Sequence, residues 1–73
     1  MNIFGRIRKE TGLNQADFAR RLKLDPVLYR MAERGRKRLT PKEFTQLFEI
    51  HKEYGGSIES FLKMVKLSAR RDK

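Results

Sequence analysis

Apolar side chains recur along this chain at the three- and four-residue spacing of helices that bury one face. Glycines, prolines and short polar runs separate these apolar stretches from one another. The pattern predicts an all-α fold, a single compact domain over residues 1–73 built from five helices. We expect helices at residues 2–11, 14–22, 26–35, 40–54 and from 57 onward, the last one fraying into a basic tail from about residue 67.

The limits of the second and third helices are marked by residues with strong end preferences. Gly12 suits the left-handed conformation that ends a helix, and Asn14 is a good N-cap with Asp17 at its third position. Farther on, Asp25 is again a favourable N-cap, and Pro26 follows at the first helical position, where its missing N–H costs nothing. Two short helices joined by a tight turn indicate a helix-turn-helix.

The second half of the chain shows the same kind of signals. Thr40 and Glu43 form a predicted capping box around Pro41, and Gly55-Gly56 ends the helix that starts there. Ser57 then begins the last helix. The fourth helix has a broad apolar stripe that we expect to pack beneath the helix-turn-helix: Phe44, Leu47, Phe48, Ile50, His51 and Tyr54.

The motif carries a family resemblance. G-L-N-Q-A-D-F-A, followed by L-D-P-V-L-Y-R-M-A-E-R-G-R-K, resembles the Cro/repressor family of DNA-binding domains (lambda-repressor-like, XRE), from about Ile7 to Phe61. The resemblance implies a lambda-repressor-like fold and a homodimer that binds a palindromic operator in double-stranded DNA. It also implies a sequence-specific transcriptional regulator, in the first place a small repressor of phage, plasmid, mobile-element or controller type. Such a protein acts in the bacterial cytoplasm or nucleoid.

Two further expectations come from the resemblance. In the family an arginine four residues before the glycine of the first turn commonly pairs with the glutamate that ends the recognition helix. Here these residues are Arg8 and Glu33, and the alternative is two unrelated surface charges worth about 0–1 kcal/mol even if they meet. The family's last helix often forms the dimer contact. We therefore expect four apolar residues of this helix to be divided between the core and the dimer interface: Ile58, Phe61, Leu62 and Val65.

The predicted recognition helix has an unusual outer face. Tyr29 and Ala32 take the core positions, which leaves mostly apolar residues outside: Pro26, Val27, Leu28, Arg30, Met31 and Arg34. Base edges are usually read by polar side chains, because hydrogen-bond donors and acceptors discriminate base pairs.

Three explanations stay open for this face. In the first explanation the helix reads bases: Arg30 forms a bidentate hydrogen bond with guanine. The apolar residues beside it would contact thymine methyl groups, and these residues are Val27, Leu28, Met31 and Pro26. Part of the set could instead be core, since a small domain needs its large side chains for burial. Or the face could dock a protein partner, which would make the chain an antagonist of another regulator.

Charge favours a polyanionic partner. The 73 residues contain 18 Lys and Arg against 9 Asp and Glu, a net charge of +9. The loop after the recognition helix is basic, as expected for a segment beside the sugar-phosphate backbone, although a solvated turn would look similar. The phosphate-contact candidates are Asn14 and Gln15 at a helix N-terminus together with Arg34, Arg36, Lys37 and Arg38.

Catalysis, metal binding and membrane association find little support. The chain has no cysteine and a single histidine, His51, which we interpret as a half-buried packing residue. None of Ser57, Ser60 and Ser68 has a histidine at a suggestive spacing, and no phosphate-binding glycine loop is present. We therefore expect a non-enzyme without cofactor or metal, and no apolar run is long enough to cross a bilayer.

Overall fold

The protein is described from a computed structural model, and the structure describes residues 2–69. Within that range the chain folds into five helices and no strand, which confirms the all-α prediction. The helices are α1 (Ile3–Thr11), α2 (Gln15–Arg21), α3 (Pro26–Glu33), α4 (Pro41–Glu53) and α5 (Ile58–Ala69).

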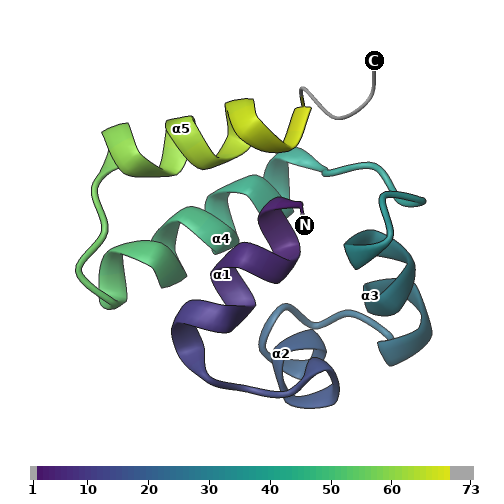
Figure 1. Cartoon of the computed structure of the whole chain (residues 1–73). Coiled ribbons are helices and arrows are strands. Elements are labelled where there is room, and N and C mark those ends of the chain that lie inside the picture. The colour runs from purple at the N-terminus through teal and green to yellow at the C-terminus, as the bar shows by residue number, and fades with distance from the viewer. Residues whose placement is uncertain (1, 70–73) are drawn as a thin grey trace.

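The arrangement places the helix-turn-helix on one side of the molecule. In Figure 1, α2 and α3 lie together at the lower right, whereas α4 and α5 form a second layer on the other side of α1. Helix α1 contacts α3, α4 and α5, and α2 packs on α3. Because α1 connects the two layers, the orientation of α3 depends on its contacts with α1.

The helix ends are built as the sequence predicts. Gly12 adopts a φ of 77°, and the side chain of Asn14 accepts a hydrogen bond from the N–H of Asp17. Asp25 caps α3 through the N–H of Val27, and the capping box at Thr40 is complete. Helix α5 extends to Ala69, and the rest of the basic tail that was predicted to fray from about residue 67 lies outside the described residues.

The core is centred on the ring of Tyr29. Edge-to-face contacts join this ring to Phe4 at 6.0 Å and to Phe18 at 5.5 Å between centroids, so α1, α2 and α3 meet at one aromatic cluster. Below it Leu47, Ile50 and Phe61 bury the inner faces of α4 and α5. Phe61 is fully buried and packs against Phe44 and Phe48, so of the four residues expected to be divided between core and dimer interface it belongs to the core.

Candidate nucleic-acid interface

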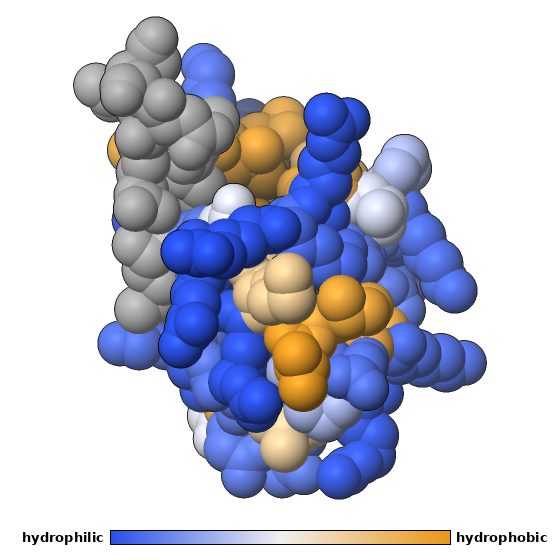
Figure 2. Space-filling view, turned by 90° about the vertical axis from the view of Figure 1, so that its right-hand side faces the viewer, coloured by the Kyte–Doolittle hydropathy of each residue, from blue (hydrophilic) through white to orange (hydrophobic). Residues whose placement is uncertain are grey.

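The outer face of α3 is apolar and open to solvent. Val27, Leu28 and Met31 expose 56%, 43% and 37% of their surface, whereas Tyr29 and Ala32 on the inner face expose none. Figure 2 shows this apolar patch surrounded by hydrophilic residues. The explanation that places part of the patch in the core is therefore excluded for the isolated chain.

Exposed cations accompany this face. Arg30 lies on α3 between the apolar residues, and Arg34, Arg36 and Arg38 follow at its C-terminal end, all of them exposed. Pro26, at the start of the helix, is exposed as well. Exposed side chains along a helix, with guanidinium groups at its end, are compatible with a DNA major groove, where base contacts lie along the helix and phosphate contacts at its end.

A hydrogen-bonded network around Glu33 holds the last turn of α3. Arg8 Nε on α1 donates to Glu33 Oε2 at 2.6 Å, so the predicted ion pair is present. The side-chain amide of Gln15 on α2 donates to Glu33 Oε1 at 2.9 Å, and the Tyr29 hydroxyl donates to Oε2. One carboxylate thus receives donors from three helices, which fixes how α3 lies against α1 and α2.

The network explains the protonation of its members. Partial burial alone would raise the pKa of Glu33, but the hydrogen bonds from Arg8, Tyr29 and Gln15 outweigh burial and lower that pKa below its ordinary value. Burial, followed by the hydrogen bond to Glu33, strongly raises the pKa of the Tyr29 hydroxyl. At neutral pH Glu33 is therefore ionised and Tyr29 is a proton donor.

Two of the predicted phosphate contacts are used inside the protein. The amide group of Gln15 is bound to Glu33, so its side chain orients α3 instead of facing a phosphate. The side-chain oxygen of Asn14 caps α2 at 2.8 Å from the N–H of Asp17. What remains at this end of α2 is the backbone: the first N–H groups of a helix have no partner within it and are suited to an anion.

The contacts of Lys37 differ from the phosphate contact that was predicted for it in the basic loop. Its ammonium group donates to both carboxylate oxygens of Glu43, at 2.7 and 2.6 Å, and to the carbonyl oxygen of Arg38. A lysine held in this way is not available to a phosphate. The loop is also tied to α3, because Gly35, at a φ of 78°, and Arg36 donate their N–H groups to the carbonyls of Ala32 and Met31.

A serine, a histidine and a carboxylate meet at the far end of the molecule. His51 Nδ1 lies 2.7 Å from Glu10 Oε1, and its Nε2 lies 2.7 Å from Ser60 Oγ. The expectation that Ser60 has no histidine partner is thus wrong, and His51 is buried instead of half-buried. However, Ser60 Oγ also accepts from the N–H of Ser57 and donates to its carbonyl oxygen, as part of the α5 start. We interpret the three side chains as a clamp between α1, α4 and α5.

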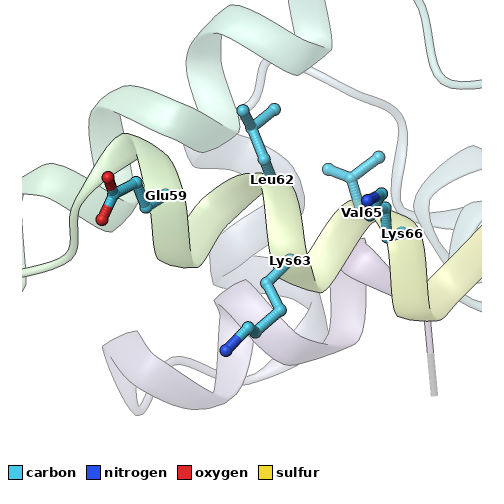
Figure 3. Close-up of a pocket in the computed structure, with 5 residues that line it drawn as sticks. All are labelled: Glu59, Leu62, Lys63, Val65 and Lys66. Carbon is cyan, nitrogen blue, oxygen red and sulfur yellow. The ribbon is translucent and has the colours of Figure 1, made fainter.

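The outer side of α5 carries the remaining dimer candidates. Ile58 and Leu62 are each 46% exposed, and Val65 is partly buried. A shallow groove runs along this helix, and in Figure 3 Leu62 and Val65 point to one side of α5 and Lys63 to the other. The structure therefore presents an apolar strip on α5 that is separate from the α3 face.

Metal and membrane features are absent from the described part of the chain. Across residues 2–69 no three side chains of the metal-binding types come together, and the helices there are too short or too polar to span a bilayer.

Comparison with known proteins gives one match. A helix-turn-helix family model matches residues 5–61, which include α2, α3 and α4 in full. No curated protein and no solved structure matches the chain.

Proposed function

Because the chain belongs to a helix-turn-helix family of the Cro/repressor (XRE) type and is a DNA-binding transcription regulator, we propose that it is a sequence-specific repressor. The observation that carries the proposal is the exposed face of α3, held at a fixed angle by the Glu33 network and flanked by exposed arginines. Occupying a promoter is enough to block polymerase, so repression requires only DNA binding. Such a repressor works in the bacterial cytoplasm or nucleoid.

In this proposal α3 lies in the major groove. Arg30 makes a bidentate contact with guanine, which is worth about 1–3 kcal/mol of discrimination against other bases. The exposed arginines 34, 36 and 38 contact phosphates at the end of α3, and the backbone N–H groups at Asn14 and Gln15 receive another phosphate at the start of α2.

In this proposal the protein binds its operator as a homodimer. The apolar strip of α5, formed by Ile58, Leu62 and Val65, is the proposed contact between two copies. Two symmetric subunits place their α3 helices in successive major grooves, about 34 Å apart, so the operator is palindromic. Dimerisation also buries apolar surface that a domain of this size cannot cover by itself.

A second function is favoured by the composition of the α3 face. Among the residues from Pro26 to Glu33, Arg30 is the one exposed side chain with hydrogen-bond donors. The same apolar face could bind another protein, in which case the chain is an antagonist of a regulator that keeps the fold of a DNA-binding domain.

Selection of bound duplexes from a random library, at about physiological salt, distinguishes these functions. A repressor should enrich a two-fold symmetric sequence, and Arg30→Gln should relax the preference at one position of each half-site. Arg36→Gln should weaken all sequences alike and reduce the slope of log affinity against log salt by about one unit. Enrichment of no sequence, together with loss of a captured partner protein in Val27→Asp, would support the antagonist.

A further inference from the structure

We propose that the α3 patch, formed by Val27, Leu28 and Met31, reads pyrimidine C5-methyl groups, so that binding depends on thymine methyls and increases when cytosines at the contacted positions carry a 5-methyl group. The proposal rests on the DNA-binding function proposed above and names the chemical group that the site recognises.

Helix α3 has few exposed polar side chains that can form hydrogen bonds with a base. On the exposed side of α3 the side-chain donors belong to Arg30, because the Tyr29 hydroxyl is committed to Glu33 within the network. Asp25, which precedes the helix, uses its Oδ1 to accept from the N–H of Val27, and as a carboxylate it supplies no donor. Hydrogen bonds from this helix can therefore specify about one base pair per half-site, and the rest of the recognition has to come from apolar contact.

The major groove contains an apolar group that the patch can contact. The base edges of the major groove offer one apolar group, the C5-methyl of thymine, and 5-methylcytosine places an identical methyl at the corresponding position. Val27 and Met31 are four residues apart and Leu28 and Met31 three, so the three side chains adjoin on the helix surface. One turn of helix rises about 5.4 Å, whereas base pairs are stacked about 3.4 Å apart. The patch is thus long enough to contact about two neighbouring base pairs.

The charges around the α3 patch favour DNA over a protein as its partner. Arg30 lies within the patch, and Arg34, Arg36 and Arg38 are exposed just beyond it. In Figure 2 hydrophilic residues, drawn in blue, border most of the patch. These exposed arginines, in a chain with a net charge of +9, complement the phosphate groups that border a major groove. The charge complementarity favours duplex DNA over an apolar protein surface.

The test replaces single thymines by deoxyuridine in the selected operator and leaves the protein unchanged. The exchange removes one methyl and keeps every hydrogen-bonding group, so each contacted position should lose about fourfold in affinity, the equivalent of one buried methyl group. Conversely, 5-methylcytosine placed at a contacted pyrimidine should bind more tightly than cytosine by a similar factor.

Two variants assign the effect to the patch. In Val27→Ala or Met31→Ala the ratio of thymine to deoxyuridine affinity should fall towards one at a particular position. In Arg36→Gln overall affinity should drop while that ratio stays unchanged. Sequence-specific binding with a ratio of one at every position would overturn methyl reading but leave the repressor proposal intact. Absence of any sequence preference in the starting selection would overturn both.

Discussion

Lys37 forms an ion pair with Glu43 across the loop that follows α3, with its Nζ 2.7 and 2.6 Å from the two carboxylate oxygens. The two side chains are 16% and 7% exposed, and Glu43 Oε1 also accepts the N–H of Thr40 in the capping box. The pair therefore fastens the basic loop to the first turn of α4. We therefore predict that Lys37 positions the neighbouring arginines and makes no phosphate contact of its own.

Lys37→Met should lower the free energy of unfolding by about 3 kcal/mol, because it leaves the carboxylate of Glu43 buried without its cation. It should leave the salt dependence of DNA binding almost unchanged, since no phosphate contact is lost. Chemical denaturation and binding titrations at several salt concentrations measure the two effects.

Two matched variants make this prediction sharp. Lys37→Met combined with Glu43→Gln should recover part of the lost stability, because no unpaired charge remains. Arg36→Gln should do the opposite of Lys37→Met, with stability kept and the salt slope reduced by about 0.9. Should Lys37→Met reduce the salt slope as much as Arg36→Gln does, Lys37 is a phosphate contact after all.

The stability of the fold should depend on pH through Glu33. Its pKa is lower in the folded protein than in the unfolded chain, so its stabilising effect is complete above the ordinary value of 4.5 and is lost as the pH falls below it. Glu33→Gln should flatten the unfolding free energy over this acidic range. At neutral pH it should cost about 1–3 kcal/mol, because Arg8 loses its charged acceptor.

The control for this prediction is Glu49→Gln, which removes an exposed carboxylate on α4. Denaturation curves from pH 3 to 7 should show the wild-type pH dependence in this variant. If Glu33→Gln kept the same acidic loss of stability as the wild type, other carboxylates would be responsible and the network would not be the pH-sensitive element.

Local signals predicted the helices well because each boundary depends on neighbouring residues. Gly12, Asn14 and Thr40 act within three positions of themselves, through backbone conformation or a capping hydrogen bond. The Arg8–Glu33 pair, 25 residues apart, was predicted from the family resemblance and not from local chemistry.

The errors concern side chains whose partners are set by packing. Gln15 and Lys37 carry the right groups for a phosphate, but the fold brings Glu33 and Glu43 within hydrogen-bond distance of them. Phe61 could not be separated from Leu62 by pattern alone, because α5 is apolar over more than one face and its rotation decides which residue is buried.

Gly56 makes room for the His51 clamp, and its replacement should show this. A Cβ at this position would lie 2.1 Å from His51 Nε2, so Gly56→Ala has to displace the imidazole from Ser60. We expect a loss of about 1–3 kcal/mol from overpacking, measured by chemical denaturation. In a His51→Ala background the same substitution should cost much less.

Gly55→Ala is the matched control in the same turn. Gly55 has a φ of 87° and open space around its Cα, so an alanine there costs about 1–2 kcal/mol of backbone strain regardless of His51. Equal costs of Gly56→Ala in the presence and absence of the His51 ring would contradict the clamp.

The α5 strip yields the prediction that tests dimerisation. Leu62 is 46% exposed in the single chain, so Leu62→Asp should change the unfolding free energy of the monomer by less than about 1 kcal/mol. A charge buried at an interface between two copies is far more costly, and the dimer should dissociate. Sedimentation at several concentrations measures this, with Lys63→Gln, on the other side of α5, as the control that changes the charge by the same one unit. A dimer that survives Leu62→Asp unchanged would show that the dimer contact lies elsewhere. Operator binding by the two variants would then show whether two linked α3 helices are needed.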